Sequence, residues 1–318
     1  MDMTSDPLTA PAAPVAASAA MPATAPAGQW ISLILATYGR STELAIVLDS
    51  LAAQTDKGFE IIVVDQNPDD RLEPVLAVER GLTIRHLRQE QPNLSLARNA
   101  GLAAATGQWV AFPDDDCWYE PECLAQVHQA ILADNNLDGV VGRWVEVAPG
   151  DVPDQHYLSL SAWRDFRGGD ASSITLFLRR EAVQALAGFD TRIGVGQYFG
   201  AGEETDLLLR MLDQNRDLLY LPQARVHHHF SHEPVPVSAR ALAAQRSRAR
   251  GVGAIYAKHR LGTKTIVRGL LAPVIKPLGG RQPVAGLLFG LAAVLGRLEG
   301  MFGWRRQGPP ARTDSEGS

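Results

Sequence analysis

Residues 30 to 112 alternate between short apolar runs and helix-like segments, and this alternation constrains the fold more than any other feature. The runs 30–37 and 59–64 are rich in Ile, Leu and Val, as strands buried on both faces are. Between them, apolar residues recur at helical spacing after Ser41 or Thr42, either of which is a suitable N-cap. The pattern predicts an α/β fold with a mostly parallel sheet covered on both faces.

The same pattern continues further along the chain. We expect additional strands at 82–87, 109–112, 140–147, 173–179 and 218–226. Helices are expected at 94–105, 181–186 and 207–212. The Gly-rich segment 188–202 is long and contains aromatic residues, which is typical of a mobile loop over a site.

Polar residues stand where the predicted strands end. Thr37 ends the first strand, Asp65 the second, and Asp114 to Asp116 follow the strand at 109–112. Ligands bind beyond the carboxyl ends of the strands in sheets of this kind. The residues are therefore expected to converge on one edge of the sheet.

The three consecutive aspartates have no basic neighbour in sequence to neutralise them. Carboxylates this crowded suit a hard divalent cation such as Mg²⁺ or Mn²⁺, which in proteins is often shared with substrate phosphates. An acidic loop or a helix N-cap before Pro121 is the competing interpretation. The sequence alone leaves both open.

A second acidic cluster, Glu203, Glu204 and Asp206, opens the helix predicted at 207–212. A helix N-terminus keeps carboxylates ionised, so one of them could act as a general base, although plain capping is the alternative. The histidines at 227–229 could complete a metal shell or form a surface run.

The two ends of the chain differ from its middle. Residues 1–28 are rich in Ala and Pro and predict a disordered tail, and their acidic, proline-broken start argues against a secretory signal. We therefore expect a cytoplasmic protein. Cys117 and Cys123 are expected to be free thiols.

Residues 239–318 contain 14 Lys and Arg but only 3 Asp and Glu. A basic segment can bind nucleic acid or an anionic membrane. The apolar runs 266–275 and 284–295 favour the membrane, and both are shorter than a spanning helix needs. We expect helices that lie on the inner face of a membrane and no nucleic-acid partner. A helical hairpin packed on protein is the alternative.

Four blocks of sequence occur in an order that resembles one known family. They are ISLILATYGR (31–40), IIVVDQNPDD (61–70), NLSLARNAGLAAATGQWVAFPDDD (93–116) and GAGEETDLLLRML (200–212), which contains the acidic helix start. Together they resemble family 2 glycosyltransferases of the GT-A fold. The resemblance implies transfer of a sugar from a nucleotide-diphosphate donor to an acceptor hydroxyl, with inversion, assisted by Mg²⁺ or Mn²⁺.

The resemblance also assigns residues of this chain to the donor. Thr37 and Asp65 match positions that contact the base and ribose, and Arg98 matches a basic position near the nucleotide. Arg40, in the first block, is assigned to donor binding with them. Asp114 matches the first member of the DxD motif and is expected to lean towards the ribose.

Metal and base positions follow from the same resemblance. Asp116 matches the stronger metal ligand, Asp114 a second one, and His228 fits the metal-contacting position after the last strand, with His227 close behind. Glu204 aligns with the general base.

Two positions depart from the family pattern. Gln66 stands where many relatives carry a second acid after the second strand, so the contacts with the nucleobase are expected to differ. The usual Glu-Asp pair near the acceptor reads Glu203-Glu204 here, so Asp206 is the alternative base.

Three segments are predicted from these features. They are a disordered tail at 1–28, a GT-A catalytic domain at 29–238 and a basic helical extension at 239–318. The expected partners are a nucleotide sugar, a lipid-linked or saccharide acceptor and a membrane surface. The expected role is assembly of a cell-surface polysaccharide or glycolipid. A sugar nucleotidyltransferase and a non-catalytic nucleotide-sugar-binding or scaffold protein remain as alternatives.

Overall fold

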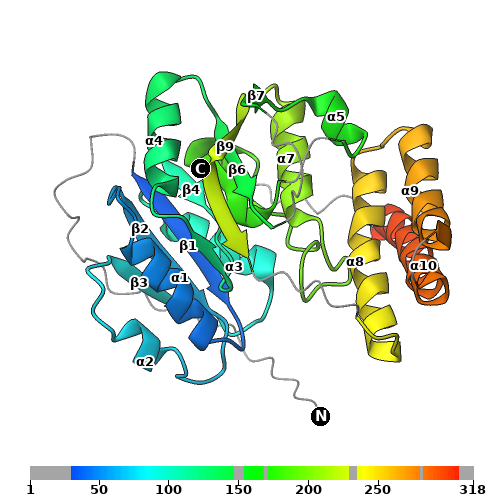
Figure 1. Cartoon of the computed structure of the whole chain (residues 1–318), viewed down its shortest axis with the longest axis horizontal. Helices are drawn as coiled ribbons and strands as arrows, with labels where there is room; N and C mark the ends of the chain where they lie inside the picture. Colours follow the sequence, from blue (N-terminus) through cyan, green and yellow to red (C-terminus); the bar gives the residue numbers. More distant parts are fainter. Residues whose placement is uncertain (1–29, 147–153, 168–170, 229–234, 280–281, 308–318) are drawn as a thin grey trace, which may run out of the picture.

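A computed structural model of the chain describes residues 30–146, 154–167, 171–228, 235–279 and 282–307. A central sheet carries helices on both faces, and three C-terminal helices stand together at one side (Figure 1). The predicted tail 1–28 and His229 lie outside the described residues.

The nine strands form one sheet in the order β3-β2-β1-β4-β8-β6-β9-β5, with β7 also paired to β9. Their bounds are β1 Ile31–Thr37, β2 Phe59–Asp65, β3 Ile84–Arg88, β4 Trp109–Ala111, β5 Cys117–Tyr119, β6 Gly139–Trp144, β7 His156–Tyr157, β8 Leu176–Arg179 and β9 Leu218–His228.

Ten α-helices and two 3₁₀ segments complete the described chain. The α-helices are α1 Thr42–Ala52, α2 Glu73–Leu76, α3 Leu94–Ala104, α4 Cys123–Ala133, α5 Leu160–Arg164, α6 Arg180–Ala185, α7 Glu203–Asp213, α8 Ala239–Lys258, α9 Thr263–Ile275 and α10 Pro283–Gln307. The 3₁₀ segments are Ser173–Thr175 and Lys276–Gly279.

The prediction of a mostly parallel sheet is confirmed. Strands β1 to β4 are mutually parallel, β8 runs against β4, and β6 and β9 return to the direction of β1. The register of β1 and β2 pairs Thr37 with Asp65, so the two strands end level with each other. The isolated pairing of Ala36 with Asp114 brings the aspartate cluster to the same edge.

Alternate residues of the central strands enter two separate cores. Leu33 and Leu35 of β1 pack in the core that includes buried residues of α1 and α4. Ile34 packs on the other face, in the core that includes residues of α3 and α7. Burial on both faces explains why these strands read as continuous apolar runs.

Some predicted elements differ from those observed. The strand expected at 173–179 begins with a 3₁₀ turn and is extended only from Leu176. The three-residue strand β5 was not predicted, because a strand this short gives no periodic signal of its own. The prediction that Cys117 and Cys123 are free thiols is confirmed, and both are buried.

The C-terminal helices pack on one another and on the catalytic part of the chain. Gly296 and Gly300 of α10 meet the backbone carbonyls of Arg246 and Arg250 of α8, an approach that any larger side chain would prevent. Ile255 of α8 lies in the same core as Leu207 and Leu208 of α7. Helix α8 thus packs on α7, and α10 packs on α8.

Candidate active site

The aspartate cluster lies in the short connection between β4 and β5. Strand β5 pairs antiparallel with β9, and this register places Cys117 opposite His228. As a result, Nε2 of His228 lies 3.0 Å from Oδ1 of Asp116. The folded sheet therefore joins two segments that are more than a hundred residues apart in sequence.

Asp114, Asp116 and His228 form a candidate metal site. Each offers one ligand atom, and these atoms all lie within 4.8 Å of one another. Two carboxylate oxygens and an imidazole nitrogen are a suitable partial donor set for a divalent cation that takes its remaining ligands from phosphate and water. The structure thus brings together the three residues predicted to bind metal.

The carboxylates of this site differ in pKa. Burial, reinforced by the neighbouring acids, raises the pKa of Asp114 although Arg98 opposes it. Burial alone would also raise the pKa of Asp116, but the hydrogen bond from His228 and the charge of Arg40 outweigh it and lower that pKa. The environment therefore favours Asp116 as the anionic ligand at neutral pH.

Asp115, to which the sequence assigned no role, binds two residues in and after the end of β1. Its Oδ2 accepts a hydrogen bond from Oγ1 of Thr37 at 2.7 Å, and its Oδ1 accepts one from Arg40 at 2.6 Å. Arg40 also contacts Asp116 at 2.5 Å. Thr37 and Arg40 thus meet the aspartate cluster directly.

Arg98, which was predicted to lie near the nucleotide, is held by two carboxylates next to the pocket. It is buried, and its guanidinium contacts Asp114 at 2.9 Å and Glu203 at 3.0 Å. It lies behind the aspartates and connects them to the first turn of α7. A buried arginine bound by two carboxylates has few donors left for a ligand.

Asp65 is likewise fully buried and engaged. It accepts hydrogen bonds from the backbone and side-chain amides of Asn67 at 2.9 and 2.8 Å. On the neighbouring strand β3, His86 lies 3.0 Å away and Arg88 donates at 2.8 Å. Asp65 therefore organises the loop after β2, where Gln66 forms part of the pocket wall.

The acids of α7 separate into different environments. Glu204 is partly buried, and burial together with the charge of Glu203 raises its pKa to about 7. A carboxylate with a pKa near the operating pH is suited to general base catalysis. Of the three acids, Glu204 has the properties expected of the base.

Asp206, the alternative base, belongs to a charge cluster on the far side of α7. It is fully buried and contacts Lys258 and His259 at 2.8 Å and Arg210 at 2.9 Å. Burial alone would raise its pKa, but the hydrogen bond from His259 and the charges of Arg210 and Lys258 lower it to about 2. With two cationic partners, Arg210 and Lys258, and a hydrogen bond with His259, Asp206 is poorly suited to accept a proton.

A pocket of about 640 Å³ lies in front of the aspartates. Its volume is within the ~300–1,000 Å³ range of ligand pockets. Four predicted site residues line it, namely Arg40, Asp114, Asp116 and His228, together with Asp115, which was not predicted. Several further wall residues were not predicted as site residues: Tyr38, Gln66, Asn93, Val195, Gly196 and Arg248.

The neighbouring histidine, His227, belongs to a separate network. Its ring nitrogens lie 2.6 Å from Glu146 and 2.9 Å from Glu120, and the ring stacks on Trp118 at 5.2 Å. Alternation along β9 turns His227 and His228 to opposite faces of the sheet. Among the described histidines of this run, His228 is therefore the one at the aspartates.

Similar folds occur in solved glycosyltransferase structures. Staphylococcus aureus TarS, in complex with UDP-GlcNAc, is 17% identical with a TM-score of 0.53, over 88% of this chain and 92% of TarS. The mannosyltransferase PcManGT from Pyrobaculum calidifontis, in complex with GDP-Man and Mn²⁺, is 17% identical with a TM-score of 0.56, over 89% and 76% of the two chains. The fold is that of the GT-A glycosyltransferases.

The sequence itself places the domain in a family. Residues 32–186 match the model of glycosyl transferase family 2. This part of the chain is a family 2 glycosyltransferase domain.

Curated relatives agree with this assignment. A glycosyltransferase of Haemophilus influenzae is 31% identical over 109 residues, which are 34% of this chain and 36% of that protein. The glucosyl-dolichyl phosphate glucuronosyltransferase of Haloferax volcanii is 26% identical over 219 residues, 62% of this chain and 68% of that protein. The putative glycosyltransferase EpsH of Bacillus subtilis is 35% identical over 100 residues, 30% and 29% of the two. The matched part thus spans about a third of the Haemophilus and Bacillus relatives.

Proposed function

We propose that the protein is a metal-dependent inverting glycosyltransferase that moves a sugar from a nucleotide-diphosphate donor to an acceptor hydroxyl. The observation that carries the proposal is the convergence of Asp114, Asp116 and His228 on one pocket, with Glu203 of α7, the neighbour of Glu204, joined to Asp114 through Arg98. Such a transfer requires a site for the cation and a general base near it.

The roles of the residues follow from their positions. Asp114, Asp116 and His228 would hold the divalent cation, which supplies charge stabilisation of the departing diphosphate when bound. Thr37, Asp65 and Gln66 lie at the ends of β1 and β2, where they would place the nucleoside. Gln66 rather than Asp65 reaches the pocket wall, so we assign nucleobase contact to Gln66.

Glu204 is proposed to remove the proton from the acceptor hydroxyl as that oxygen attacks the sugar. Its raised pKa of about 7 allows it to accept the proton at neutral pH. Glu203, which is bound to Arg98, is proposed to fix the first turn of α7. Gly202, with a φ of 99°, provides the left-handed residue that starts this helix.

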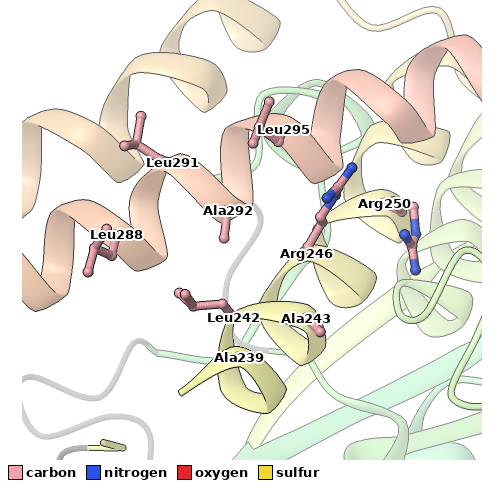
Figure 2. Close-up of a pocket in the computed structure, with 9 residues that line it drawn as sticks. All are labelled: Ala239, Leu242, Ala243, Arg246, Arg250, Leu288, Leu291, Ala292 and Leu295. Carbon is pink, nitrogen blue, oxygen red and sulfur yellow. The ribbon is translucent and has the colours of Figure 1, made fainter. Parts of the chain in front are cut away.

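We also propose that the C-terminal helices attach the protein to the cytoplasmic face of a membrane. Exposed apolar side chains gather on α9 and α10, among them Leu271, Ile275, Val284, Leu291 and Phe302. A groove of about 470 Å³ lies between α8 and α10. Figure 2 shows leucines of α10, such as Leu288 and Leu291, toward one end of it and Arg246 and Arg250 toward the other. Apolar side chains beside arginines are typical of helices that lie at an anionic interface.

The helix α10 is longer than the apolar run that predicted it. It extends over 25 residues. Among the described helices, it alone is long and apolar enough to cross a membrane, judged by length and composition only. Its Gly290, Gly296 and Gly300 nevertheless pack against backbone of α8 and α9. We therefore assign it to the surface, as part of a packed three-helix unit, with residues 239–318 as the membrane-associating segment.

A lipid-linked acceptor is consistent with this location, and the Haloferax relative is named as a transferase that acts on glucosyl-dolichyl phosphate. Assembly of a cell-surface polysaccharide or glycolipid is the proposed setting. The test is a screen of nucleotide sugars for release of nucleoside diphosphate, with Mg²⁺, Mn²⁺ or EDTA, in the presence of membrane lipid extract. Metal-dependent release that disappears in Asp116→Ala supports the proposal. Binding of a nucleoside diphosphate without transfer to any acceptor would instead indicate a binding protein.

A further inference from the structure

Arg248 brings a positive charge from the C-terminal helices to the active-site pocket. It lies on α8, outside the segment that matches the family, and lines the pocket together with Asp114 to Asp116. Its side chain is exposed, and no hydrogen bond or ion pair joins it to any residue that the structure describes. Its neighbours on α8 are different, because Arg246 and Arg250 both contact Glu299 of α10.

The other arginines near the aspartates are already engaged by carboxylates. Arg40 contacts Asp115 and Asp116, and Arg98 is buried between Asp114 and Glu203. Within the described part of the pocket wall, Arg248 is therefore the arginine whose guanidinium forms no ion pair with a carboxylate.

The backbone around Arg248 is held in place relative to the pocket. The preceding residue, Ser247, accepts a hydrogen bond through its carbonyl from the backbone amide of Gly200 at 3.2 Å. Gly251 packs directly on the backbone of Ala201, where a Cβ would not fit. The helix that carries Arg248 is thus fixed against the loop 188–202, which also lines the pocket through Val195 and Gly196.

We propose that Arg248 binds a phosphate group of the ligand in this pocket, and specifically the diphosphate of the donor. The inference rests on the proposed function. A guanidinium presents several N–H donors in a plane and pairs in bidentate fashion with phosphate oxygens. The aspartates would hold the cation, and Arg248 would add a second positive charge to the same pocket.

The same phosphate chemistry could come from two sources. One is the diphosphate of the donor, and the other is the phosphate of a lipid-linked acceptor. Both would be bound by the same guanidinium, so two separate ligands are needed to tell them apart.

The experiment measures ligand binding to the full chain by calorimetry in the presence of Mn²⁺. The variants are Arg248→Ala, the charge-conserving Arg248→Lys and a matched control, Arg240→Ala, on an exposed position of the same helix that does not line the pocket. The ligands are a panel of nucleoside diphosphates in one arm and a short-chain isoprenyl phosphate in the other. Thermal unfolding checks that all variants are folded.

We expect Arg248→Ala to weaken nucleoside diphosphate binding by about tenfold to a hundredfold, as loss of a charged hydrogen bond does. Arg248→Lys should lose less, and Arg240→Ala should match the wild type. A loss confined to the isoprenyl phosphate would retain the phosphate site and assign it to the acceptor. Wild-type affinity of Arg248→Ala for both ligands would overturn the inference. If the wild-type chain itself bound no nucleoside diphosphate, the proposed function would fail instead, whatever the isoprenyl phosphate arm showed.

Discussion

Arg98 and Glu203 form a buried ion pair of 3.0 Å that joins α3 to the first turn of α7. The other terminal nitrogen of Arg98 lies 2.9 Å from Asp114, so one guanidinium connects the proposed metal site to α7, which carries the proposed base. This link gives the site a fixed geometry before any ligand binds.

Replacement of Arg98 should destabilise the fold as well as the site. Arg98→Met leaves the buried Glu203 without its partner, and breaking a buried pair in this way costs about 3–5 kcal/mol. Chemical denaturation should show this loss in the free energy of unfolding. Arg71→Ala, which removes an exposed pair with Asp69, is the control and should change stability little. A stable, active Arg98→Met variant would contradict the linking role.

Asp116→Asn should reduce metal affinity and transfer together. The loss of one anionic ligand removes part of the charge that holds the cation, and metal assistance is worth several kcal/mol at the transition state. We expect a rate at least about a hundredfold lower. Mn²⁺ titration and initial rates measure the two effects. Asp70→Asn, at an exposed position after β2, should bind Mn²⁺ like the wild type.

The proposed base predicts a pH dependence. Because Glu204 must be ionised to accept a proton and its pKa is raised to about 7, kcat/KM should rise with pH and level off above about 7. Glu204→Gln should lose transfer but keep donor binding. Full activity in Glu204→Gln would exclude Glu204 as the base.

The same pKa shift has a consequence for stability. A carboxyl group whose pKa is raised on folding disfavours the folded state once the unfolded chain ionises. The wild type should therefore lose stability relative to Glu204→Gln as the pH rises from about 4.5 to about 7. Equal pH dependence in the two proteins would contradict the assigned environment. Denaturation curves across this window provide the measurement.

Asp206 is predicted to stabilise the contact between α7 and α8. Its pKa is lowered from 3.8 to about 2, so its contribution is fully present above about pH 4 and is lost as the pH falls through about 2. Asp206→Asn should reduce the free energy of unfolding at pH 7 by on the order of 3 kcal/mol, because Arg210 and Lys258 lose the charge of their shared partner. Asp213→Asn, at the exposed end of the same helix, is the matched control.

Membrane attachment should depend on the exposed leucines of α10. Leu291→Asp combined with Leu295→Asp places charges where apolar side chains would enter the interface, so sedimentation with anionic vesicles should fall about tenfold or more. Leu132→Asp, an equally exposed leucine on α4, should sediment like the wild type. Failure of the full-length wild type to sediment would remove the membrane proposal.

The sequence already determined the alternation of strands and helices that begins at residue 30, although not the short strands β5 and β7, because buried strands and amphipathic helices have distinct local patterns. It also determined that Thr37, Asp65 and the aspartates follow strand ends. These features depend on residues near one another in the chain.

Only the tertiary structure decided how the site's residues divide their contacts. The pairing of β5 with β9 brings His228, rather than His227, next to Asp116. The packing of α7 on α8 brings Asp206 into contact with Lys258 and His259. Asp115, which had no role in the sequence, became the partner of Thr37 and Arg40. Such contacts join residues tens to more than a hundred positions apart, and no local pattern records which of several like charges will meet when the chain folds.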